Sequence, residues 1–150
     1  MNNGRNNHEK VKDIGLTLLS EGKTIRIKAH GYSMYPSIKP GSMILIEPLS
    51  IKGLPRPGEI IAIRREQGLI VHRLSKIINI NGIISYIARG DSNAIADNPI
   101  NINKIAGRII RSEGTGENPV PADISVNTSP NYIINRIRVI VILLFKKILS

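Results

Sequence analysis

The sequence predicts a mainly β protein: a coiled, mostly antiparallel sheet or partial barrel, with a short helix before it and an amphipathic, apolar helix after it. Three observations support this fold class. Short apolar runs recur through the middle of the chain, Gly, Pro and Asn separate them, and helical spacing of apolar residues occurs only at the two ends. The strands are expected at 24–29, 43–48, 59–65, 69–80, 83–89 and 104–112. Asn81-Gly82, between the fourth and fifth strands, is the strongest hairpin signal.

The chain has 150 residues, enough for one domain with a proper core. We divide it into four segments. Residues 1–23 hold a polar tail and a short helix, and 24–113 form the core. Residues 114–130, rich in Gly, Pro, Asn, Ser and Thr, are expected to be a linker, and 131–150 a basic, apolar helix.

The N-terminal helix is expected over residues 8–21. Val11, Ile14 and Leu18 recur there at helical spacing, and Gly22 is a suitable C-terminal stop.

The C-terminal helix is expected from Tyr132 to Leu149. It contains an uninterrupted apolar run of seven residues, Val139 to Phe145, with two basic residues on each side. Seven is far below the roughly 20 residues that a spanning helix requires. Two placements stay open: an anionic membrane surface or partner, or packing against the domain. The sequence shows neither a signal peptide nor a full transmembrane span, so we expect a cytoplasmic or peripherally membrane-associated protein.

Composition excludes several functions. The chain has no Cys, and therefore no disulfide or thiol nucleophile. His8, His30 and His72 lie far apart without metal-ligand spacing, so we expect no metal site and no cofactor. With one Phe, four Tyr and no Trp, the chain has few platforms for stacking bases. The net charge of +10 is concentrated in both flanks, and we expect no nucleic-acid partner.

A Gly- and Pro-rich loop from Gly31 to Gly41 joins the first two predicted strands. Gly31 allows a positive φ or a close backbone approach, and Pro36 holds the preceding residue extended. Such a loop can fix one small side chain, that of Ser33. Taken alone, the loop also fits a simple connector between strands.

Two further stretches carry side chains that could act with Ser33. His72 lies within an apolar strand, where it also fits a buried structural histidine. Asp91 and Asp97 lie in an Asx-rich loop, where the alternative is a backbone-capping turn. Together these residues supply a nucleophile, a base and an orienting acid. Neutral His72 could take the Ser33 proton, and the Ser33 N–H would be the oxyanion donor.

The motifs that contain these residues resemble those of a known superfamily. They are, in order, Gly31-x-Ser33-Met34-x-Pro36, Pro57-Gly58-Glu59-Ile60-Ile61-Ala62, Val71-His72-Arg73, Gly90-Asp91-Ser92-Asn93 with Asp97, and Ile105-Ala106-Gly107-Arg108-Ile109. They resemble the ordered motifs of the signal peptidase I superfamily, which includes the self-cleaving LexA and phage-repressor proteins. The resemblance covers roughly residues 24–112 and implies the coiled β-sheet of that superfamily.

The resemblance also implies roles for individual residues. Bacterial-type signal peptidases and repressor autoproteases have Lys at the base position, whereas endoplasmic-reticulum and archaeal types have His, as here. Ser33 is thereby implied as nucleophile, His72 as general base and Asp97 as triad acid, ranked above Asp91. Asp91 would support the loop, as would Gly31 and Met34 around the oxyanion donor. Without an N-terminal span, the chain resembles compact bacterial members of the superfamily.

Three functions follow as hypotheses. The favoured one is a serine endopeptidase that cleaves leader or signal-like peptides or preproteins, bound in extended form by β-addition. The second is a repressor-type autoprotease. It is less favoured because the segment before the first strand has no Ala-Gly or Cys-Gly site. The third is a non-catalytic peptide-binding or membrane-associated module on the same fold.

Overall fold

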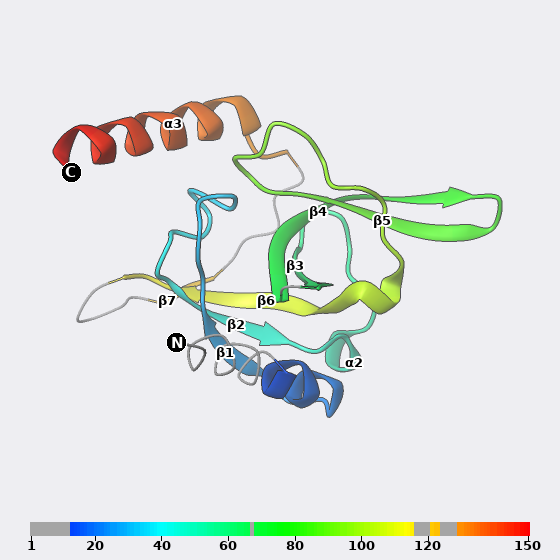
Figure 1. Ribbon diagram of the computed structural model, residues 1–150. Coiled ribbons are helices and arrows are strands. Elements are labelled where there is room, and N and C mark those ends of the chain that lie inside the picture. The colour runs from blue at the N-terminus through cyan, green and yellow to red at the C-terminus, as the bar shows by residue number, and fades with distance from the viewer. Residues whose placement is uncertain (1–12, 67, 116–120, 124–128) are drawn as a thin grey trace.

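A single, strongly curved antiparallel sheet forms the body of the protein (Figure 1). The structure is a computed structural model that describes residues 13–66, 68–115, 121–123 and 129–150. The strands are β1 (Ile25–Lys28), β2 (Met43–Glu47), β3 (Ile60–Arg65), β4 (Gly68–Ile80), β5 (Ile83–Arg89), β6 (Ile105–Glu113) and β7 (Pro121–Asp123). Their order is β1-β2-β6-β3-β4-β5, and β7 pairs with β6. The predicted fold class is confirmed.

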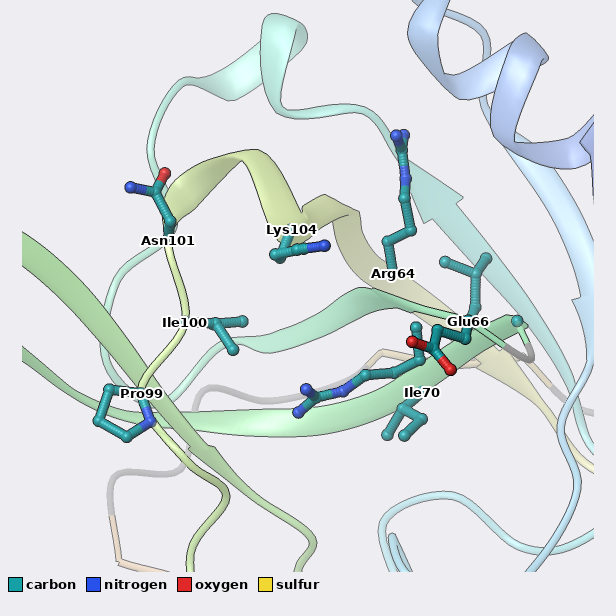
Figure 2. A pocket seen from close by; sticks show the side chains of 10 residues that line it. Arg64, Glu66, Ile70, Pro99, Ile100, Asn101 and Lys104 are labelled. Atoms are coloured by element: carbon teal, nitrogen blue, oxygen red, sulfur yellow. The ribbon is translucent and has the colours of Figure 1, made fainter.

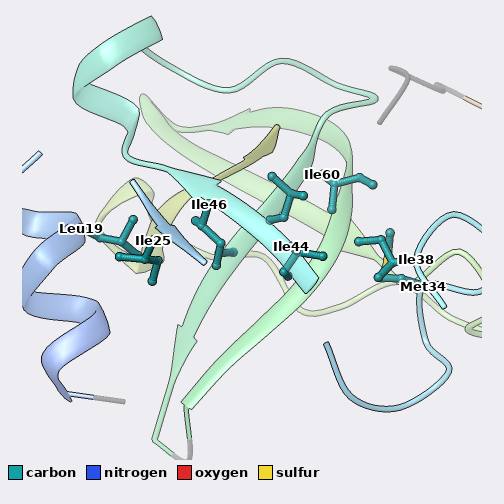
Figure 3. Close-up of a cluster of buried hydrophobic side chains, with 9 residues drawn as sticks. Leu19, Ile25, Met34, Ile38, Ile44, Ile46 and Ile60 are labelled. Carbon is teal, nitrogen blue, oxygen red and sulfur yellow. The ribbon is translucent and has the colours of Figure 1, made fainter. Parts of the chain in front are cut away.

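The central strand β3 explains why the sheet has a core on each side. Its first four residues are all buried, and successive side chains of a strand point to opposite faces. Ile60 and Ala62 enter one hydrophobic cluster with Leu19 and Ile44 (Figure 3). The residues that alternate with them enter a second cluster, which contains Ile61, Ile63, Leu74, Tyr86, Ala88, Ile100 and Ile105.

The β4–β5 hairpin turns at the predicted position. Ile80 pairs with Ile83, so Asn81-Gly82 is the turn. β4 is long enough to pair with two strands in succession. Its first part, up to Arg73, lies against β3, and its second part, from Arg73 onward, lies against β5.

Helices lie at the two ends of the chain, as predicted. Residues 13–20 are helical and the predicted last residue, Glu21, already lies in the following turn; the predicted residues 8–12 and the polar tail lie outside the described residues. The C-terminal helix α3 (Tyr132–Leu149) has the predicted bounds. In Figure 1 it extends along one side of the molecule, away from the first helix.

Three short elements were not predicted. They are the helix α2 (Leu49–Lys52), the 3-10 turn η1 (Ile102–Lys104) and the strand β7, which lies within the expected linker 114–130. Each has only three or four residues, too few to show a periodic pattern. The linker residues 116–120 and 124–128 lie outside the described part of the chain.

Candidate active site

The loop that carries Ser33 is held in place by two of its own apolar side chains, those of Met34 and Ile38. Gly31 has a φ of +74°, the positive value for which the sequence suggested glycine. Met34 and Ile38 are 4% and 3% exposed and pack into the first hydrophobic cluster. Met34 therefore anchors the backbone next to Ser33, whose own side chain stays partly accessible.

The loop that follows β5 packs directly against the Ser33 loop. The backbone N–H of Ser92 donates to the Ser33 carbonyl at 2.9 Å, and its hydroxyl donates to the Tyr32 carbonyl at 2.6 Å. A Cβ on Gly90 would lie 2.7 Å from the Ser33 carbonyl oxygen, which is closer than a Cβ atom comes to a non-bonded heavy atom in proteins. Glycine at position 90 is thus what allows the two loops to meet.

His72 and Asp97 form a close pair. His72 lies on β4 and is 6% exposed, and its Nδ1 lies 2.6 Å from Asp97 Oδ2. The Asp97 backbone N–H donates to the Ala88 carbonyl at 2.8 Å, which fixes the carboxylate relative to the end of β5. An imidazole held at Nδ1 in this way presents its Nε2 on the opposite side of the ring.

Asp91 has different partners. It is fully buried and accepts two hydrogen bonds from Arg73, Nε to Oδ1 at 2.9 Å and Nη2 to Oδ2 at 2.8 Å. The Ser37 hydroxyl donates to the same carboxylate at 2.5 Å, and Arg73 Nη1 donates to the Gly58 carbonyl at 2.7 Å. This network joins the Ser33 loop, the turn at Gly58, the strand that carries His72 and the loop after β5. The carboxylate in contact with the imidazole is that of Asp97.

Within the described part of the chain, Ser33 and His72 share no hydrogen bond, and His72 does not itself line the hollow beside Ser33. Ser33 lines a hollow of about 210 Å³ together with Val71, the residue before His72. Among the described residues, neither the Ser33 hydroxyl nor its backbone N–H has a hydrogen-bond partner. Both groups are therefore available to a molecule in the hollow. Most of the lining is apolar: Ile27, Ala29, Met34, Ile38, Ile44, Leu69, Ile70 and Val71.

Two unpaired strand edges flank this hollow. β1 lies at one end of the sheet, and its residues 27 and 28 line the hollow from one side. On the other side, β4 pairs with β5 only from Arg73 onward, so within the described residues the outer edge of 68–72 has no strand partner. An extended chain could pair with such edges.

A larger cavity adjoins this hollow and shares Leu69 and Ile70 with it. It has a volume of about 820 Å³ and lies between the β3–β4 turn and residues 99–104 (Figure 2). Arg64, Arg65 and Lys104 contribute positive charge to its wall and Glu66 contributes an acid. None of Ser33, His72 and Asp97 lines it, so its size does not identify it as the site of chemistry.

The C-terminal helix is joined to the same loops. Asn135, 7% exposed, donates from Nδ2 to the Asp91 carbonyl at 3.1 Å. The Arg89 guanidinium lies 3.7 Å from the centre of the Tyr132 ring, and burial raises the pKa of that phenol above its ordinary value. Lys146 lies 5.2 Å from the centre of the Tyr32 ring, next to Ser33. Among the described helices, none combines the length and hydropathy needed to cross a bilayer.

Sequence reasoning missed Ser37 and Asn135. Ser37 lies in the quoted loop but has the composition of an ordinary turn residue, so nothing local distinguishes it. Asn135 did leave a signal, because it is an amide within the first turns of an otherwise apolar and basic helix.

Comparison with known proteins tests the resemblance. A search of curated proteins gives no significant match. The family model described as Peptidase S24-like matches residues 3–110, most of the chain. The chain therefore belongs to the Peptidase S24-like family, within the serine peptidase superfamily of LexA and the signal peptidases that its motifs predicted.

Proposed function

We propose that this protein is a serine endopeptidase of the signal peptidase type, which cleaves leader or signal-like peptides with Ser33 as nucleophile and His72 as general base. The observation that carries the proposal is the 2.6 Å contact between His72 Nδ1 and Asp97, on a strand where the residue before His72, Val71, lines the same hollow as Ser33. A carboxylate at Nδ1 selects the tautomer in which Nε2 can accept a proton.

The proposed chemistry uses groups in fixed positions. His72 Nε2 takes the Ser33 proton as Oγ bonds to the substrate carbonyl carbon, and Asp97 stabilises the imidazolium. The Ser33 N–H, free of internal partners in the described chain, donates to the developing oxyanion. The imidazolium then protonates the leaving amine as the C–N bond breaks, and water hydrolyses the acyl-enzyme. The Ser33–His72 hydrogen bond is expected to form when substrate binds, because such bonds often tighten only in the complex.

The hollow supports an extended peptide substrate. A strand laid between the free edges of β1 and β4 would gain backbone hydrogen bonds from both. The apolar wall and the volume of about 210 Å³ suit a small apolar side chain next to the scissile bond. We therefore expect cleavage after small residues such as Ala.

Acylation of Ser33 is the direct test. The purified chain should react with a fluorophosphonate probe at Ser33, and the reaction should disappear in Ser33→Ala. It should fall by roughly 10³-fold or more in His72→Ala, because the base is removed. Ser50→Ala, which removes an exposed hydroxyl on α2, should still label at position 33. Full labelling of His72→Ala would show that the assigned base is wrong.

The family match also admits self-cleavage, since the superfamily includes LexA-type autoproteases. The same preparation distinguishes the two activities. A peptidase shortens added leader peptides and keeps its own mass, whereas an autoprotease cuts its own chain at a rate independent of protein concentration.

A further inference from the structure

The helix α3 is attached to the domain by its more polar side. The residues that face the protein are Tyr132, Asn135 and Lys146, through the contacts to Arg89, Asp91 and Tyr32 described above. Val139 and Ile142, which lie on the same side, are the other partly covered residues of the helix. A surface helix of a soluble domain ordinarily does the reverse and buries its apolar face.

The opposite side of α3 is a continuous apolar surface, which we call the apolar arc. At 100° per residue, it spans about 140° of the helix circumference with no polar side chain. Its residues are between 43% and 78% exposed. They are Ile133, Ile134, Ile137, Ile140, Val141, Leu144, Phe145 and Ile148.

Positive charge borders the apolar arc on both sides. Arg136 and Lys147 lie along one edge of the arc and Arg138 along the other, by their helical positions. Residues 129–150 contain no Asp or Glu. Cations beside an exposed apolar stripe are typical of helices that lie in the headgroup region of a membrane, where they meet anionic lipids.

We propose that α3 binds an anionic membrane surface, with the apolar arc immersed at the boundary between headgroups and acyl chains. A second copy of the chain is a less suitable partner for the apolar arc. Two arcs packed together would bring the bordering cations of both copies close to one another, and like charges repel. The helix would lie parallel to the surface. Membrane binding in this orientation brings the Ser33 loop close to the bilayer, since Tyr32 lies against Lys146.

Vesicle binding by the full chain tests the proposal without relying on peptidase activity. The chain should sediment with vesicles of equal parts phosphatidylcholine and phosphatidylglycerol. It should sediment much less with phosphatidylcholine alone, and high salt should release it. Because the two lipid compositions are compared with the unaltered chain, this result does not depend on whether the substituted chains fold.

Substitutions locate the binding surface. Ile137→Gln should lower the vesicle partition coefficient about tenfold, and Ile137→Gln with Leu144→Gln about a hundredfold, because each removes one immersed aliphatic side chain. Leu54→Gln is the matched control. Leu54 is 65% exposed and follows α2, which Figure 1 shows on the other side of the sheet from α3. This variant should bind vesicles as the unaltered chain does.

Two results would overturn the proposal. One is binding that is equal for both lipid compositions or equally weakened by Leu54→Gln. The other is a lack of vesicle binding together with a dimer in analytical ultracentrifugation that Ile137→Gln dissociates, which would assign the apolar arc to a second copy.

Discussion

The two aspartates of the loop after β5 should have separable roles, and the replacement Asp91→Asn tests this most directly. Asp91 is 0% exposed and accepts two hydrogen bonds from Arg73, which is 2% exposed. The amide keeps the shape of the side chain but leaves the buried guanidinium without this negative charge. Breaking a buried ion pair on one side costs about 3–5 kcal/mol of folding free energy, and the melting temperature of a chain of this size should fall by about 10 °C.

Urea unfolding measures this loss, and Asp97→Asn is the matched control. The same chemical change is made six residues further on, where the side chain is 19% exposed and, within the described residues, pairs only with His72. We expect a loss of about 1 kcal/mol or less in stability, since a single partly exposed hydrogen bond is replaced. Acylation of Ser33 should nevertheless fall by roughly 10³- to 10⁴-fold, because the imidazole loses the group that fixes its tautomer.

The double variant Arg73→Met with Asp91→Leu completes the test. Removing both charges should recover part of the stability lost in Asp91→Asn, because no uncompensated charge stays buried. The reasoning is refuted if Asp91→Asn unfolds at the same urea concentration as the unaltered chain, or if Asp97→Asn is the more destabilised of the two.

Two further predictions concern the contacts of the same loop. Gly90→Ala should destabilise the fold and abolish acylation, because its Cβ would lie 2.7 Å from the Ser33 carbonyl; Gly114→Ala, with nothing within 4 Å, should have neither effect in the same assays. Asn135→Ala should raise hydrogen exchange in α3 by roughly tenfold while the strands stay protected, because the bond to the Asp91 carbonyl is worth about 1–2 kcal/mol. If Asn135→Ala left the exchange rates of α3 unchanged, or raised those of the strands as much, the attachment of α3 would not depend on this contact.

The strand positions were predictable because strand periodicity is a local property. The predicted ranges agree with the observed strands to within one residue at either end, from 24–29 against Ile25–Lys28 to 104–112 against Ile105–Glu113. The hairpin at Asn81-Gly82 was equally predictable, since two residues specify that turn. Short elements such as α2 depend on the surrounding packing more than on their own residues.

The sequence alone determined the family, the order of its motifs and the residue types available for chemistry. Which carboxylate meets His72 depends on the fold, because Asp91 and Asp97 have the same side chain and differ in the partners brought to them: Arg73 for Asp91 and His72 for Asp97. The fold also decided which side of α3 faces the protein. Amphipathic periodicity defines an apolar face, but the contacts of Tyr132, Asn135 and Lys146 with the domain turn that face outward.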